Sequence, residues 1–198
     1  MKRVVITGMG IVSPIGNNVE TFRTNLMAGR HGIGPITRFD TSDYKATLGA
    51  EVKDFDPSHL IEKKELRRFD LFSQYALVAA DEAMQSAGLL ETAFDHDRAG
   101  VYIGSGIGGM LAFENGLRDL DQKGPRRVSP FLIPAMISNM ATGQVAIRYG
   151  LRGPSLPVVT ACATSTNAIG EAFRNIRYGY SDLILAGGSE ASMTDIAV

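Results

Sequence analysis

The stretch Pro157-Val158-Val159-Thr160-Ala161-Cys162-Ala163-Thr164-Ser165-Thr166 decides the fold class, because it passes from an aliphatic run through small residues into a helical pattern. We expect a strand at 156–160, buried on both faces, and a helix at 164–178 that Gly179 ends. The inward face of that helix is predicted to carry Ile169, Ala172, Phe173 and Ile176. A strand that leads directly into a helix is typical of α/β proteins.

The same alternation of strand and helix patterns continues along the chain. Further strands are predicted at 3–7, 100–104 and 182–186, where aliphatic runs end against glycine or other small residues. The clearest helix has apolar residues at 3.6-residue spacing from Phe72 to Ala87 and stops at Gly88. A shorter helix is predicted to begin near Asn17 and close at Gly29, and residues 30–65 predict loops and short strands. The sequence therefore predicts an α/β layered fold without an interdomain linker.

Composition excludes several classes of protein. The 198 residues are 44% hydrophobic and 21% charged, which is too apolar for a disordered chain. A net charge of -1, from 20 Lys+Arg and 21 Asp+Glu, disfavours a general nucleic-acid binder. No apolar run approaches the length of a membrane span, and the start has no secretory signal pattern. The single cysteine excludes an intramolecular disulfide and a cysteine-based metal cage, so we expect a reducing compartment. A start that leads directly into the first predicted strand suits a cytoplasmic enzyme.

A glycine-rich loop raises the question of a nucleotide. Gly104-Ser105-Gly106-Ile107-Gly108-Gly109 matches the G-x-G-x-x-G pattern after a predicted strand. The dinucleotide fingerprint also needs a second strand with an acidic end about 20 residues on. Here residues 110–121 predict a helix and residues 124–127 a turn. We therefore favour glycines that let backbones pack closely or that line a narrow channel.

Cys162 is the candidate reactive residue of this sequence. Its position at a turn beside a helix N-terminus would favour the thiolate, and its backbone N–H could hold an oxyanion. The small neighbours Ala161 and Ala163 leave room for a substrate carbonyl, so thioester chemistry fits. A small buried apolar residue is the alternative. Three histidines stand in predicted loops or helix ends, and nothing in the sequence pairs them with Cys162: His31, His59 and His96.

Several blocks together resemble one family. They are Val4-Val5-Ile6-Thr7-Gly8-Met9-Gly10, Gly104-Ser105-Gly106-Ile107-Gly108-Gly109, Ser129-Pro130-Phe131-Leu132-Ile133-Pro134, Asn139-Met140, Gly150-Leu151-Arg152-Gly153-Pro154, Thr160-Ala161-Cys162 and Ala186-Gly187-Gly188-Ser189-Glu190. In these blocks the chain resembles the N-terminal half of a type II β-ketoacyl-acyl carrier protein synthase, the condensing enzyme that elongates fatty acyl chains. The resemblance implies a thiolase-like fold of two similar α/β halves, of which residues 1–198 are the first.

The resemblance also implies roles for individual residues. Cys162 falls on the nucleophile that takes the acyl group from acyl carrier protein, beside Ala161. Ile107, between Gly106 and Gly108, falls where a side chain moves to admit longer acyl chains. Leu132 falls where a neighbouring subunit closes the acyl pocket, which implies a homodimer. Plain core packing is the alternative for both apolar residues. No metal or redox cofactor is implied, because the phosphopantetheine arm belongs to the carrier substrate.

Basic residues form two clusters in a protein of nearly zero net charge. The first cluster is Lys63, Lys64, Arg67 and Arg68, at helical spacing, and the second is Lys123, Arg126 and Arg127. A solvated helix face, paired with Glu62 and Glu65, is the alternative to a binding surface. The resemblance implies that acidic acyl carrier protein docks here.

The resemblance places other catalytic groups outside these residues. Two histidines, a lysine and the second oxyanion donor belong to the family's second half, so we expect that residues 1–198 alone do not complete the condensation. The function implied is decarboxylative condensation of malonyl-carrier with an acyl group on Cys162, extending the chain by two carbons. A polyketide-type ketosynthase and a non-catalytic, chain-length-determining partner subunit remain as alternatives.

Overall fold

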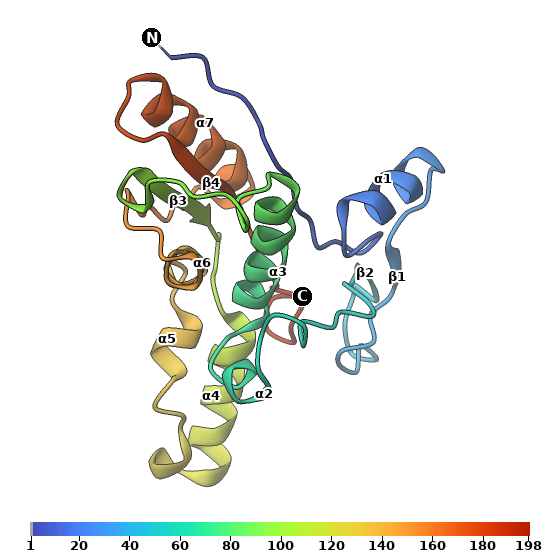
Figure 1. The fold of residues 1–198 in the computed structure, drawn as a ribbon. Coiled ribbons are helices and arrows are strands. Elements are labelled where there is room, and N and C mark those ends of the chain that lie inside the picture. The colour runs from blue at the N-terminus through green and yellow to red at the C-terminus, as the bar shows by residue number, and fades with distance from the viewer. Residues whose placement is uncertain (1) are drawn as a thin grey trace.

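The computed structural model describes residues 2–198, and in it a parallel pair of strands lies between helices (Figure 1). Strand β3 (Ala99–Gly104) pairs with β4 (Leu183–Gly188) over their full length, from Ala99 beside Leu183 to Gly104 beside Gly188. Both strands were predicted within two residues of these bounds. Within the described chain β4 pairs with β3 alone, so its second edge has no strand partner.

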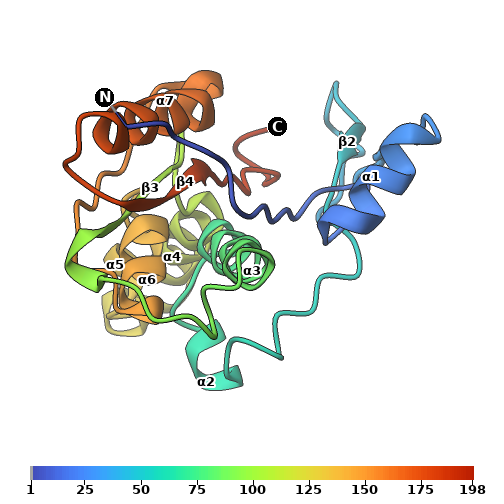
Figure 2. The same cartoon turned by 45° about the horizontal axis from the view of Figure 1, so that its top comes forward.

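Helices cover both faces of this sheet, which gives three layers (Figure 2). Helices α3 (Leu71–Ser86) and α6 (Met140–Tyr149) lie on one face, and α7 (Thr164–Arg177) lies on the other. Side chains of β3 alternate accordingly. Val101 and Ile103 belong to the large core with α3 and α6, whereas Tyr102 packs with Ala168 and Ala172 of α7. The α/β layered fold is confirmed.

Helix α3 forms as its apolar spacing predicts. Its N-cap is Asp70, whose carboxylate accepts from the backbone N–H of Phe72, and Gly88 follows its end at a φ of 69°. Phe72 and Met84 are almost completely buried. Gly88 is conformationally suited to this position because the left-handed region is open to glycine.

Helix α7 also has the predicted bounds, but its buried face differs from the prediction. Ala168 and Ala172 are buried, whereas Ile169 and Phe173 remain 51% and 41% exposed. The apolar stripe is wider than the contact with the sheet, and the small alanines are the residues that let the helix approach β3 and β4 closely. The prediction that Ile169 and Phe173 face inward is therefore wrong for the described chain.

Part of the chain before α3 forms a small lobe beside the layers (Figures 1 and 2). It contains α1 (Val19–Met27) and an antiparallel pair, β1 (Ile33–Pro35) with β2 (Leu48–Ala50). The N-cap of α1 is Asn18, one residue after the predicted Asn17, because Asn18 Oδ1 accepts from the N–H of Thr21 at 2.8 Å. Asn17 instead donates to the carbonyl oxygen of Lys53 at 2.8 Å.

The remaining elements are short or lie on the periphery. They are the helices α2 (Lys63–Leu66), α4 (Met110–Lys123) and α5 (Leu132–Met136), with the 3-10 turns η1 (His96–Arg98), η2 (Pro125–Arg127) and η3 (Ala161–Ala163). Between residues 2 and 198 no helix is both long enough and apolar enough to cross a membrane.

Two predicted strands do not form. Residues 3–7 are extended and mostly exposed, and a strand needs a backbone partner that the described residues do not offer them. Residues 156–160 lie beside β3, where the N–H of Leu156 donates to the carbonyl oxygen of Val101 at 3.0 Å. Ladder pairing between this segment and the sheet is limited, among the described residues, to a single parallel bridge between Ser155 and Val101, so no strand is formed there. Both predictions are wrong for the described chain.

Candidate active site

Cys162 lies on a strained turn directly before α7. It is the middle residue of η3, and its side chain is a free, exposed thiol. The preceding Ala161 has a φ of 49°, in the left-handed region that costs an L-residue about 1–2 kcal/mol. Such strain persists only where neighbouring contacts hold it, and it gathers at functional sites.

Three polar contacts hold this turn against the start of α7. The N–H of Thr160 donates to Thr164 Oγ1 at 2.9 Å, and Asn167 Nδ2 donates to Thr160 Oγ1 at 2.7 Å. The N–H of Ala163 donates to the carbonyl oxygen of Thr160 at 3.1 Å. Cys162 itself lies where backbone N–H groups precede the intrahelical ladder, so an exposed thiol and a backbone N–H suited to holding an oxyanion belong to one residue. The predicted position of Cys162, at a turn beside a helix N-terminus, is confirmed.

The glycine loop packs against the same turn. A Cβ added at Gly106 would lie 3.7 Å from the Cα of Ala161 and 3.0 Å from Glu190 Oε2. Gly108 has a φ of 81°, and a Cβ there would lie only 2.5 Å from the carbonyl oxygen of Met136. The predicted role of the glycines in close backbone packing is confirmed. Residues 110–123 form the helix α4, so the second strand of a dinucleotide site does not follow the loop.

Two carboxylates that the sequence analysis did not single out hold the loop and the first turn of the helix after it. Glu190 accepts from the N–H groups of Gly106 and Ile107 at 2.9 and 3.1 Å. Asp70 Oδ2 accepts from the N–H of Ala112, in the first turn of α4, at 2.7 Å. Burial raises the pKa of Asp70, the hydrogen bond from Ala112 opposes that rise, and the charge of Glu190 adds to it. The available signal was Glu190 itself, a charged residue just past the end of a predicted parallel strand.

The apolar residues singled out for the acyl pocket occupy different surroundings. Ile107 is 52% exposed on the glycine loop. Leu132, the first residue of α5, packs against α4 of its own chain, since a Cβ added at Gly116 would lie 2.8 Å from Leu132 Cδ1. This contact is local to α4 and α5, because Leu132 is half-buried and belongs to neither of the two core clusters. Closure of a neighbouring subunit's pocket by Leu132 stays a prediction.

The six basic residues predicted to dock a carrier are all exposed: Lys63, Lys64, Arg67, Arg68, Arg126 and Arg127. Lys64 pairs with Glu62 at 2.7 Å, and Glu65 belongs to the capping box of α2. The Arg68 guanidinium lies 4.7 Å from the centre of the Phe131 ring, which joins the end of α2 to the start of α5. The basic face is thus only partly neutralised by its own acidic residues.

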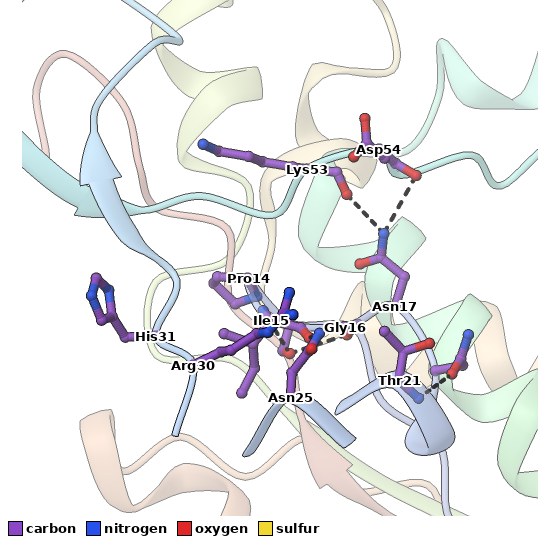
Figure 3. A pocket seen from close by; sticks show the side chains of 12 residues that line it. Pro14, Ile15, Gly16, Asn17, Thr21, Asn25, Arg30, His31, Lys53 and Asp54 are labelled. Atoms are coloured by element: carbon purple, nitrogen blue, oxygen red, sulfur yellow. Dashed lines mark hydrogen bonds between the residues drawn. The ribbon is translucent and has the colours of Figure 1, made fainter. Parts of the chain in front are cut away.

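Two of the three histidines lie in parts of the fold away from Cys162. His96 stacks on Phe94, with ring centres 4.5 Å apart, just before the first residue of β3. Cys162 lies near the opposite end of β3, because it follows Val158, whose carbonyl oxygen lies against Gly104. His31 lines a separate pocket of about 480 Å³ in the lobe, where Asn17 points toward the backbone of Lys53 (Figure 3). In residues 2–198 no cluster of three or more His, Cys, Asp or Glu could hold a metal ion.

Comparison with known proteins places this geometry in a family. The profile described as "Beta-ketoacyl synthase, N-terminal domain" matches residues 1–198. The chain belongs to the beta-ketoacyl synthase family. The resemblance found in the sequence is thereby confirmed, and the thiolase-like fold is that of the matching ketosynthase structures.

Curated relatives match this beta-ketoacyl synthase domain from end to end. The chain is 53% identical over 197 residues to 3-oxoacyl-acyl-carrier-protein synthase 2 of Staphylococcus aureus, covering 100% of this chain and 48% of the relative. It is 47% identical to the protein of the same name from a Synechocystis species, covering 99% of this chain and 47% of the relative. The chain therefore spans about half the length of the curated relatives it matches.

Solved structures with the same fold include ketosynthases from other systems. The ishigamide ketosynthase/chain length factor superposes with a TM-score of 0.88 at 32% identity, covering 99% of this chain and 49% of that one. A type II PKS acyl-carrier protein in complex with its ketosynthase gives a TM-score of 0.85 at 26% identity, covering 100% and 53%. The beta-ketoacyl synthase domain thus keeps one backbone arrangement across distant sequences.

Proposed function

We propose that this domain carries the acyl-accepting centre of a 3-oxoacyl-acyl-carrier-protein synthase, an acyltransferase that elongates fatty acids. The exposed Cys162 thiol on a strained turn, with its own N–H at the start of α7, is the observation that supports this function. A thiol placed beside an oxyanion donor is suited to acyl transfer between thioesters. The 53% identity to a protein of that name favours fatty-acid elongation over two alternatives. They are a polyketide-type ketosynthase and a chain-length-determining partner, and the structures of a type II PKS ketosynthase and of a ketosynthase/chain length factor match at 26% and 32%.

The proposed chemistry has two half-reactions. In the first, Cys162 Sγ attacks the thioester carbonyl of acyl-carrier, a tetrahedral oxyanion forms, and the carrier thiol leaves with a proton. In the second, malonyl-carrier loses carbon dioxide, and the resulting carbanion attacks the acyl carbon on Cys162. That step forms a carbon–carbon bond and returns the Cys162 thiolate. The chain spans about half the length of its curated relatives, and the resemblance implies that the groups that stabilise the malonyl carbanion belong to the other half.

The proposal includes an acidic acyl carrier protein as partner. The exposed basic residues at α2 and η2 supply a surface of opposite charge, and one structural neighbour is a ketosynthase in complex with an acyl-carrier protein. We further propose a homodimer in the cytoplasm. The proposed enzyme needs no cofactor of its own, because the phosphopantetheine arm arrives with the carrier.

The test measures acylation of the complete gene product by intact mass. Incubation with acyl-carrier is expected to add one acyl group to the wild-type protein and none to the Cys162→Ala variant. Adding malonyl-carrier should then remove the adduct and release a product two carbons longer. A folded wild-type protein that gains no adduct would overturn the enzyme function and favour the chain-length-determining partner subunit.

A further inference from the structure

The carboxylate of Glu190 accepts several hydrogen bonds from the glycine loop. Because β3 and β4 are parallel and in register through Gly104 and Gly188, the residues that follow both strands emerge side by side. The carboxylate of Glu190 accepts from the N–H groups of Gly106 and Ile107 at 2.9 and 3.1 Å. It also accepts from Ser105 Oγ at 3.3 Å. Three consecutive loop residues therefore depend on one side chain.

Both ends of this arrangement are anchored. Ser189 fixes the backbone beside Glu190, because its N–H donates to Gly104 at 2.9 Å and its Oγ donates to the carbonyl oxygen of Phe72 at 2.6 Å. The buried Ser105 fixes the far side of the loop, since its Oγ accepts from the N–H of Gly108 at 2.9 Å. The carboxylate can thus transmit its position to the whole loop.

The loop in turn lies against the cysteine turn. Gly106 fits between Glu190 Oε2 and the Cα of Ala161, at 3.0 and 3.7 Å from the position of an added Cβ. The following residue, Ile107, is 52% exposed and is the one long apolar side chain of residues 105–109. The resemblance implies that Ile107 meets the acyl chain carried by Cys162, and the exposed Ile107 side chain is free to make that contact. Its accessible positions are limited by the backbone that Glu190 holds.

We infer that Glu190 is a positioning residue that fixes the 105–108 loop and thereby determines how strongly Ile107 discriminates between short and long acyl chains. This inference rests on the proposed function. When the carboxylate is removed, the N–H groups of Gly106 and Ile107 lose their acceptor and the loop can move away from Ala161. The Ile107 side chain then moves aside more easily for a long acyl chain. The rate of Cys162 acylation by long chains therefore rises relative to the rate with short chains.

The experiment compares rates of Cys162 acylation from dodecanoyl-carrier and butyryl-carrier in the complete gene product. The ratio of long-chain to short-chain rates is expected to rise about fivefold in Glu190→Ala, which is the effect of losing two ordinary hydrogen bonds at the low end of their net contribution. The low end applies because Glu190 is exposed and water can partly replace its carboxylate. Glu190→Gln retains an amide oxygen that can accept from both N–H groups, so its ratio should stay within about twofold of wild type. An unchanged ratio in a folded Glu190→Ala protein would overturn the inference.

Two further variants keep the test decisive. In an Ile107→Ala background the Glu190→Ala change should leave the ratio unaltered, and an independent shift there contradicts action through Ile107. If Glu190→Ala does not fold, Ser105→Ala removes the links to Glu190 and Gly108 and should raise the ratio in the same direction; an unchanged ratio counts against the inference. If wild-type protein is acylated but the ratio of long-chain to short-chain rates is the same in the variants, only this inference is refuted. If wild-type protein is not acylated at all, the proposed function is refuted.

Discussion

Replacing Thr164 by valine tests whether the cysteine turn is held by its side-chain hydrogen bond. Valine has the same shape and keeps the methyl group that lies beside Gly104, but it cannot accept from the N–H of Thr160, now 2.9 Å from Thr164 Oγ1. One neutral hydrogen bond contributes about 1 kcal/mol to the free energy of unfolding. The cost stays near that value because the exposed Thr160 can bond to water instead.

The free energy of the lost hydrogen bond is comparable with the cost of the left-handed backbone conformation at Ala161. Ala161 in the left-handed region costs about 1–2 kcal/mol, so a turn freed by about 1 kcal/mol spends more time in relaxed conformations that misplace the thiol and N–H of Cys162. Since 1.36 kcal/mol corresponds to about tenfold in rate, acyl transfer to Cys162 should slow about fivefold.

The matched control is Thr166→Val, the same chemical change two residues along α7 at an exposed position. Urea unfolding gives the stability difference between the variants, and intact mass against time gives the rate of acyl transfer. If Thr164→Val and Thr166→Val match each other in both measurements, the hydrogen bond does not maintain the turn and the reasoning is refuted.

Three further predictions concern other parts of the molecule. Arg67→Glu should slow association with acyl carrier protein about fivefold and reduce the salt dependence of the association rate, whereas the control Arg23→Glu on α1 should change neither. Stopped-flow association rates at low and high salt decide between a docking surface and a helix face that is only solvated. Asp70→Asn should stabilise the protein at neutral pH, because burial raises the pKa of Asp70 and its ionised form is disfavoured in the folded state. That gain should shrink as pH falls through the raised pKa toward about 4, so urea unfolding that shows a gain increasing on acidification contradicts the account. Phe72→Ala should lower the free energy of unfolding by about 3–5 kcal/mol, since Phe72 is 0% exposed at the centre of the large core, and a loss below about 1 kcal/mol in the same assay would be incompatible with that packing.

The elements that sequence predicted well are those that carry their own signals. Helix α3 has a long apolar period, an N-cap and a terminal glycine, and β3 and β4 are short aliphatic runs closed by glycine. The predicted strands at 3–7 and 156–160 had the same local pattern. A strand also needs a neighbour in the correct register, and local composition does not contain that information.

In the site, too, residues with local sequence signals could be predicted, and residues that act through distant contacts could not. Cys162 could be located because the strand-like run, the small residues and the helix are contiguous in sequence. Glu190 and Asp70 could not be assigned roles, because each acts on a loop that is distant along the chain and is brought near by the pairing of β3 with β4 or by the packing of α3. The same limit applies to Ile169, whose exposure depends on how closely α7 approaches the sheet.

The unpaired edge of β4 bears on how this domain is handled in the laboratory. A strand whose backbone groups lack a partner can template pairing with another chain, and a pair of parallel strands has little cooperativity to resist it. Residues 2–198 expressed alone should therefore be prone to intermolecular β-association, with that strand as the nucleating surface. Co-expression with a segment that pairs along β4 is the rational remedy, in preference to changes on the helical faces.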